Sequence, residues 1–134
     1  MDRVTSPRND DECIEQAIVS KGLTATRVTP ADVANEIASE HYFTAKNGVD
    51  GAYWGPPRAE STYESGPIVD VSLRLLTFCV IVLRNGFTVT GESTYASPEN
   101  FDAQIGRRVA RANAVQKIGP LLGFRFKDAL NKQG

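Results

Sequence analysis

Residues 73–93, LRLLTFCVIVLRNGFTVTGES, carry the strongest secondary-structure signal in the sequence. Residues 73–83 are rich in β-branched and aromatic side chains, which predicts a strand. Both faces of this strand are apolar, so we expect it to be central and covered by helices. Asn85-Gly86 predicts a two-residue type I′ turn, in which both residues take a positive φ. Residues 87–93 then return, which predicts a small antiparallel sheet centred on a β-hairpin.

The returning strand alternates between two kinds of face. Successive side chains of a strand point to opposite sides of the sheet. Phe87, Val89 and Gly91 therefore share one face, and the other face carries Thr88, Thr90 and Glu92. We expect this threonine and glutamate face either to meet water or to line a site.

Helices are expected over residues 11–21, 30–41 and 98–118, with a short last turn or helix reaching Leu130. The second begins with Thr29 as N-cap and Pro30 as first helical residue. The third begins the same way at Ser97-Pro98, and Pro120 is expected to end it. Its core-facing residues are expected to be Phe101, Ile105 and Ala112, with Val109 beside them.

The organisation predicted for the 134 residues is a flexible N-terminus, 1–9, and a single α+β domain, 10–134. Residues 43–70 carry turn signals such as Asn47-Gly48 and Asp50-Gly51 among aromatic side chains. We expect short strands or loops there, forming an irregular surface. Loops on a rigid scaffold often carry function, so this segment is a candidate ligand-facing region.

The charge is balanced, with 15 basic and 16 acidic residues and a formal net charge of −1. Nucleic-acid-binding domains normally carry a basic excess, so the composition argues against nucleic acid as a partner. The longest apolar run, residues 75–83, is far short of the ~18 residues that span a membrane, and no secretion signal is visible at the N-terminus. We expect Cys13 and Cys79 to be reduced, buried thiols in a cytoplasmic protein.

No complete catalytic or metal-binding set is present. Residues 86–93 resemble a phosphate-binding loop, but Glu92 stands where that motif needs lysine, and a hairpin is the wrong context. His41 is the only histidine, so it is expected to end the second helix and interact with its dipole rather than to bind zinc or activate a nucleophile. Solvated surface charge is the favoured interpretation of Glu60, Glu64 and Asp70. The sequence therefore predicts a protein that is not an enzyme and holds no cofactor or metal.

Arg107, Arg108 and Arg111 are the candidate binding residues with the clearest physical basis. Their spacings of three and four place them in one sector of the helix, and guanidinium groups hold phosphates in bidentate pairs. The alternative is a solvated helix face balanced by Glu99 and Asp102. A set of aromatic side chains could either stack a base or pack in the core; it comprises Tyr42, Tyr53, Trp54, Tyr63 and Phe87.

Several motifs resemble a phage family. They are RVTPAD (27–32), SEHYFT (39–44), LTFC (76–79), NGFTVTGES (85–93), SPENFD (97–102), IGR (105–107) and ANA (112–114). Together they resemble the small tailed-phage proteins grouped as the gene-product forty-nine and sixty-six family, over most of the chain beyond residue 10. That family is mostly described as being of unknown function.

The family is similar in turn to the first Thoeris anti-defence family of phage sponges. Those are non-enzymatic oligomers that sequester cyclic ADP-ribose-type signals made by bacterial immune enzymes. The resemblance implies a protein that acts in the cytoplasm of an infected bacterial host. It transfers no binding residues to this chain, so the predicted site comes from the hairpin and the helix alone.

The leading hypothesis is a phage protein that sequesters a small anionic signalling nucleotide, either cyclic ADP-ribose-like or a cyclic oligonucleotide. The alternative is an interaction module that inhibits a host protein through the aromatic segment 42–63. A homo-oligomer is expected, paired through the hairpin edge or the apolar tail. For the nucleotide, phosphates are assigned to Arg107 and Arg111 with Arg108 beside them, base stacking to Phe87 or Tyr42, and ribose contacts to Thr90 and Asn100.

Overall fold

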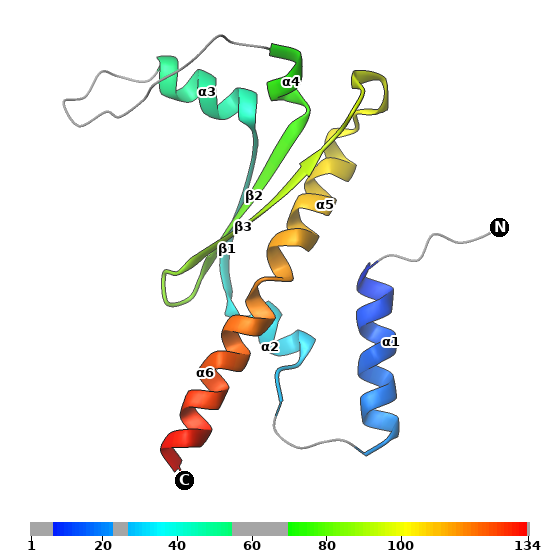
Figure 1. The fold of residues 1–134 in the computed structure, drawn as a ribbon, viewed down its shortest axis with the longest axis vertical. Helices are drawn as coiled ribbons and strands as arrows, with labels where there is room; N and C mark the ends of the chain where they lie inside the picture. The colour runs from blue at the N-terminus through cyan, green and yellow to red at the C-terminus, as the bar shows by residue number, and fades with distance from the viewer. Residues whose placement is uncertain (1–6, 23–26, 55–69, 134) are drawn as a thin grey trace, which may run out of the picture.

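A three-stranded antiparallel sheet in the order β1-β2-β3 organises the fold (Figure 1). The computed structural model describes residues 7–22, 27–54 and 70–133. The expected α+β class is confirmed. The elements in chain order are α1 (Pro7–Ser20), α2 (Pro30–Glu36), β1 (Ile37–Thr44), α3 (Ala45–Trp54), α4 (Asp70–Arg74), β2 (Leu76–Leu83), β3 (Thr88–Thr94), the 3-10 turn η1 (Pro98–Asn100), α5 (Ala103–Val115) and α6 (Ile118–Gln133).

The hairpin of β2 and β3 is present, but its turn differs from the predicted type I′ turn. Gly86 has a positive φ of 90°, whereas no described residue other than glycine does, so Asn85 cannot occupy a type I′ position. The amide of Gly86 donates to the carbonyl of Leu83 at 2.8 Å, and the amide of Leu83 donates to the carbonyl of Phe87 at 2.8 Å. These bonds close a three-residue loop, a type I turn followed by a bulge glycine. The register still places Val89 and Gly91 on the buried face, as expected.

Helix α5 covers one face of the sheet, as Figure 1 shows. On that face β2 buries four alternate side chains, Thr77, Cys79, Ile81 and Leu83. The opposite face, which carries Phe78, Val80 and Val82 of β2, is only partly buried, and no described helix lies across its centre. The expectation that β2 is central is confirmed, but helices cover one of its faces rather than both. One covering helix is enough because the antiparallel sheet is short and its other face is partly polar.

The face of α5 that meets the sheet is made of the smallest side chains. Gly106, Ala110 and Ala114 are buried, whereas Ile105 and Val109 are 52% and 43% exposed. The predicted core face of Ile105 and Ala112 was therefore wrong by about four-tenths of a helical turn, at about 100° per residue. Close approach of the helix to Gly91 of β3 is the physical reason, because larger side chains would hold the two backbones apart.

The second helix begins as predicted but ends early. The Thr29 hydroxyl accepts from the amide of Asp32 at 3.1 Å, and the Asp32 carboxylate accepts from the amide of Thr29 at 2.9 Å, which completes a capping box. The helix stops at Glu36, and β1 follows where helix was expected up to His41. Two turns of helix have little stability of their own. Pairing with β2 from Ile37 to Thr44 therefore decides the conformation.

Part of the segment predicted as strands or loops is helical. α3 takes in both turn signals, Asn47-Gly48 and Asp50-Gly51, and α4 precedes β2, which starts at Leu76 rather than at residue 73. Residues 55–69 lie outside the described part of the chain, and with them Glu60, Tyr63 and Glu64. Asp70 lies 3.3 Å from the ammonium of Lys46 and 3.9 Å from the guanidinium of Arg74, which agrees with a surface charge.

The predicted third helix, 98–118, is divided into three elements. η1 takes its first turn, α5 begins after the N-cap Asp102, and α6 begins at Ile118. Pro120 lies in the first turn of α6, where a missing amide leaves no helical bond unmade. The proline that was expected to end one helix therefore lies near the start of the next.

The N-terminal helix α1 stands apart from the sheet in Figure 1. It begins at Pro7, four residues before the predicted start. Arg27, which precedes α2, contacts this helix: its Nη1 and Nη2 donate hydrogen bonds to Oε1 and Oε2 of Glu15 at 2.9 and 2.7 Å. Cys13 is exposed on α1 and Cys79 is buried, so the expectation of two buried thiols holds for Cys79 alone. Within the described residues, no helix combines the length and apolarity that crossing a membrane requires.

Candidate functional site

The flank of α5 that faces β1 carries two of the predicted arginines. Arg107 and Arg111 are four residues apart, so their side chains leave the helix on the same side, one turn from each other. Arg111 reaches the carboxylate of Glu40 on β1, with Nε 2.9 Å from Oε1 and Nη2 3.1 Å from Oε2. The contact links residues 71 positions apart. It places the arginine flank beside the outer strand of the sheet.

Arg111 and Glu40 belong to a cluster that also contains Tyr42 and Cys79, and the pairing of β1 with β2 shows where its members lie. Glu40 is paired with Ile81 and Tyr42 with Cys79, so all four side chains lie on the face that α5 covers. The Tyr42 hydroxyl donates to Glu40 Oε1 at 2.7 Å. Glu40 therefore accepts from both Arg111 and Tyr42. Two predicted site residues, Arg111 and Tyr42, therefore meet at the carboxylate of Glu40, which was not predicted as a site residue.

The pKa shifts in this cluster keep Glu40 and Arg111 charged, and Tyr42 and Cys79 neutral, at neutral pH. Hydrogen bonding to Arg111 is the main cause that lowers the pKa of Glu40, and the same contact raises the pKa of Arg111. Burial, followed by the bond to Glu40, raises the pKa of Tyr42. Burial also raises the pKa of the Cys79 thiol. At neutral pH the cluster thus contains a carboxylate, a guanidinium, a phenol and a thiol.

The exterior of α5 carries positive charge that no described residue neutralises. Glu40 neutralises Arg111, whereas no described residue forms an ion pair or a side-chain hydrogen bond with Arg107 or Arg108. Arg108 points away from the sheet, because it lies nearly opposite the buried Ala110 face of the helix. The flank can therefore accept an anion at Arg107 and at the remaining Nη1 of Arg111.

The seven predicted ligand-binding residues do not all meet in one copy of the chain. Arg107, Arg111 and Tyr42 come together, with Arg108 on the outer side of the same helix. Thr90 is paired with Val80 on the face of the sheet away from α5. Phe87 lies at the hairpin turn and Asn100 in η1, beyond opposite ends of β3.

Glu40 and Cys79 are the members of the cluster that sequence analysis missed. A signal for Glu40 exists in the sequence, because Glu40 and Tyr42 are two positions apart, which is the spacing of side chains on one face of a strand. The prediction of a helix up to His41 concealed that spacing. His41 instead lies on β1, where its Nε2 is 3.0 Å from the Ser39 hydroxyl.

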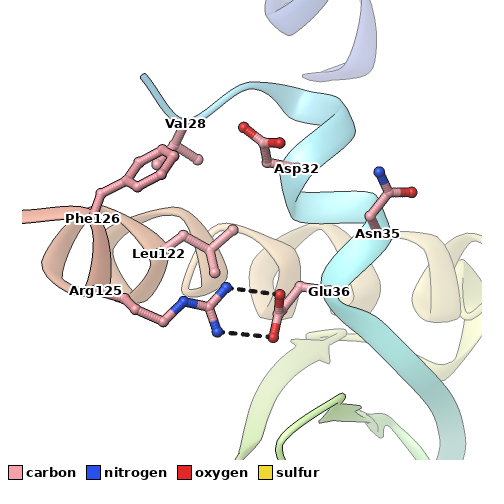
Figure 2. Close-up of a pocket in the computed structure, with 7 residues that line it drawn as sticks. All are labelled: Val28, Asp32, Asn35, Glu36, Leu122, Arg125 and Phe126. Carbon is pink, nitrogen blue, oxygen red and sulfur yellow. Dashed lines mark hydrogen bonds and ion pairs between the residues drawn. The ribbon is translucent and has the colours of Figure 1, made fainter. Parts of the chain in front are cut away.

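Two small hollows lie elsewhere, between α2, α6 and the hairpin turn. The first has a volume of about 270 Å³, and Figure 2 shows Val28, Leu122 and Phe126 beside the ion pair of Glu36 and Arg125. That pair has Nη2–Oε1 and Nη1–Oε2 distances of 2.9 and 3.2 Å. The second hollow has a volume of about 200 Å³. Both are smaller than the ~300–1,000 Å³ of usual ligand pockets, so neither would enclose a nucleotide. Within the described residues no group of three or more His, Cys, Asp or Glu side chains could hold a metal ion.

The chain is a bacteriophage protein by its sequence. Over residues 28–130 it matches the Phage protein (N4 Gp49/phage Sf6 gene 66) family, and it belongs to that family. The match includes every predicted ligand-binding residue and begins after α1. It confirms the family resemblance. No curated protein and no solved structure matches the chain.

Proposed function

We propose that this phage protein binds and sequesters a small anionic signalling nucleotide without chemical turnover, and so counters the immunity of its host. The ligand would be a cyclic ADP-ribose-like molecule or a cyclic oligonucleotide. The resemblance to the Thoeris anti-defence sponges supports the proposal, and so does the family's origin in phages. The proposed place of action is the cytoplasm of the infected bacterial cell.

The observation that carries the proposal is the cluster on the β1 side of α5. It sets Arg107, which has no ion-pair partner among the described residues, one helical turn from Arg111, and it holds Tyr42 beside them through Glu40. Phosphates would contact Arg107 and the free edge of Arg111, and a base would pack on the Tyr42 ring, which is 36% exposed. The proposed binding mode does not use Thr90, Asn100 or Phe87, because these residues lie away from the β1 side of α5.

The directions of the pKa shifts fit binding rather than proton transfer. A general acid or base works best with a pKa near the operating pH. In this cluster the pKa of Glu40 is lowered, and those of Tyr42 and Cys79 are raised. All three values move away from neutrality, which favours a site that holds its ligand unchanged.

Calorimetry with cyclic ADP-ribose isomers and cyclic oligonucleotides tests the proposal. Replacing both Arg107 and Arg111 with alanine should weaken binding at least about tenfold, since each guanidinium makes charge-assisted bonds. Arg74→Ala removes the same charge from α4 and serves as the control. Glu40→Gln should tighten binding, because it frees Arg111 from its carboxylate. Silence across the whole panel with folded protein would refute the proposal, and a chemically altered nucleotide would refute the absence of turnover.

A second candidate function is the inhibition of a host protein. The open face of the sheet favours it, because Phe43 is 38% exposed there and stacks at a centroid distance of 5.6 Å on the partly buried Phe78. Part of the aromatic segment proposed for this role, residues 55–63, lies outside the described chain. A host protein captured from lysate by the Arg107/Arg111 alanine variant, but not by Phe43→Asp, would support this function over nucleotide binding.

A further inference from the structure

The two hollows beside α6 are neighbouring parts of one surface groove. Glu36, Leu122 and Arg125 line both of them. The groove extends from the start of α2 to the turn of the hairpin, because Val28 lines the first hollow only and Asn85 the second only. We call it the α6 groove. Each hollow alone is smaller than a usual ligand pocket, whereas the two together fall within the usual range of ~300–1,000 Å³.

The groove offers two apolar compartments separated by an ion pair. Leu122, which is 7% exposed, forms the floor that both compartments share. Figure 2 shows Phe126 near Leu122 in the first hollow, and Phe87, which is 57% exposed, borders the second. The ion pair of Glu36 and Arg125 lines both hollows, so it lies where they meet. A ligand with two apolar groups and a polar stretch between them fits this order.

Positive charge exceeds negative charge at the point where the hollows meet. Hydrogen bonding to Arg125 is the main cause that lowers the pKa of Glu36, and the charge of Arg84 lowers it further. Arg84 is held in place because its Nε donates to the carbonyl of Asn35. No described residue forms an ion pair with Arg84. Asp32, the other carboxylate of the groove, accepts within the capping box at the start of α2. The Nη atoms of Arg84 can therefore bind a further anionic group.

A carboxamide side chain lines each hollow, Asn35 the first and Asn85 the second. The Oδ1 of Asn85 accepts from the amide of Phe87 at 3.0 Å, which leaves its amino group to donate. No described residue forms a hydrogen bond with the side chain of Asn35. A carboxamide both donates and accepts, so it matches the N–H and C=O groups of a peptide backbone. Apolar compartments for side chains and carboxamides for a main chain favour a polypeptide as the occupant.

We propose that the α6 groove binds a short segment of a partner protein in which an acidic side chain lies between two large apolar ones. One apolar side chain enters the hollow beside Phe126, and the other packs on Phe87. The carboxylate between them binds the guanidinium of Arg84, above the intact pair of Glu36 and Arg125. The contact uses neither the α5 arginines nor the open face of the sheet, so it is independent of nucleotide binding.

Selection from a displayed library of random short peptides, with the full chain as bait, tests the kind of partner. The recovered peptides should share an acidic residue flanked within a few positions by two large apolar residues. The tightest peptide, labelled with fluorescein, is then titrated with the protein and followed by anisotropy. Lysine in place of its acidic residue should weaken binding about tenfold. A library without a binding peptide, a lysine form that binds equally well, or peptides that reproduce a stretch of this chain itself would each overturn the proposal.

Variants of the groove test where the labelled peptide binds. Phe87→Ala should weaken binding at least about tenfold, because aromatic side chains carry a large share of binding energy. Arg84→Glu should weaken it about tenfold and should instead favour the lysine form of the peptide. Phe124→Ala removes a ring that is 72% exposed on α6 but outside the groove, and it should leave binding unchanged. Thermal melting checks that all three variants remain folded. Equal affinity for the Phe87 variant and the wild type overturns the proposal.

The double variant with alanine at Arg107 and Arg111 separates this surface from the nucleotide site. It should bind the labelled peptide as tightly as the wild type does, even where nucleotide binding is lost. Loss of peptide binding in this variant, with the Arg84→Glu protein binding normally, would place the peptide on the flank of α5 and overturn the assignment to the groove. Failure of the nucleotide panel leaves the peptide result unaffected, since the two sites share no residue.

Discussion

Gly91→Ala is expected to be severely destabilising, although it adds only one carbon atom. Gly91 lies on β3 directly beneath α5. A Cβ atom there would be 2.9 Å from the carbonyl carbon of Asn113, and closer still to the carbonyl oxygen of Ala110 and the amide nitrogen of Ala114. All three are backbone atoms, so no side-chain rotation can relieve the overlap. The helix itself would have to move.

The magnitude follows from what α5 covers. A shift of roughly an ångström would loosen its contacts with the buried residues of β2 and β3, because closely packed interiors do not absorb added volume. Overpacking usually costs about 1–3 kcal/mol and occasionally more. Since the displaced element covers the core, we expect about 3–4 kcal/mol. At about 3 °C per kcal/mol for a chain of this size, the melting temperature should fall by about 10 °C.

Thermal unfolding followed by circular dichroism or calorimetry measures this loss. Gly123→Ala is the matched control, because a Cβ at this position of α6 meets no atom within 4 Å. It should stabilise the protein by about 0.5–1 kcal/mol, as alanine does in place of glycine within a helix. A Gly91→Ala protein that melts within a degree or two of the wild type would show that α5 does not approach β3 as described.

Three further predictions concern the cluster, the helix cap and the core. Arg111→Ala should lower the free energy of unfolding by about 1 kcal/mol at neutral pH. Because Arg111 lowers the pKa of Glu40 from its ordinary 4.5, the stabilisation should be present above pH 4.5 and should fade as the pH falls through the folded-state pKa. A loss of stability that stays the same in acid would contradict the pairing. Asp102→Ala removes the cap that accepts from the amide of Ile105 at 3.0 Å and should cost about 1 kcal/mol in urea unfolding, whereas an unchanged midpoint would exclude a capping role. Ile81→Ala should cost about 2–5 kcal/mol because the side chain is fully buried, and Ile105→Ala on the exposed flank of α5 should cost far less; the reverse order would mean that the assigned core face is wrong.

Elements with strong local signals could be predicted from the sequence. The hairpin follows from a continuous apolar run, a turn glycine and an alternating return strand. The start of α2 follows from Thr29, Pro30 and Asp32, which form the capping box by themselves. These features depend on residues within a few positions of one another, so no knowledge of the rest of the chain is needed.

Elements that depend on distant residues were mispredicted. Residues 37–41 have a helical pattern, but pairing with β2 makes them part of an edge strand. Ile105 and Val109 are apolar and nevertheless exposed, because the helix packs on the sheet through Gly106, Ala110 and Ala114. Here the hydrophobic pattern was outweighed by the close approach of α5 to β3. The periodicity of apolar residues in a single sequence does not show how closely two segments approach.

The candidate site divides in the same way. Arg107 and Arg111 were predicted from helical spacing, and the structure places both on one flank. Glu40, which binds Arg111 and Tyr42, was missed because it lies 71 positions from Arg111 and in a segment predicted as helix. Thr90 was assigned to the site from the sequence, but the register of β3 puts it on the opposite face of the sheet.

The amino-acid sequence was therefore enough to predict the α+β class, the central hairpin, the capping box and the phage family, because each depends on a local pattern or on motif identity. The three-dimensional structure was needed to establish which face of α5 meets the sheet, which predicted residues lie together, and that Glu40 joins Arg111 to Tyr42. The physical reason is that a strand's partner and a helix's rotation are set by packing between segments far apart in the chain. A single glycine, Gly91, determines how closely the two segments approach and thereby which side of α5 remains outside.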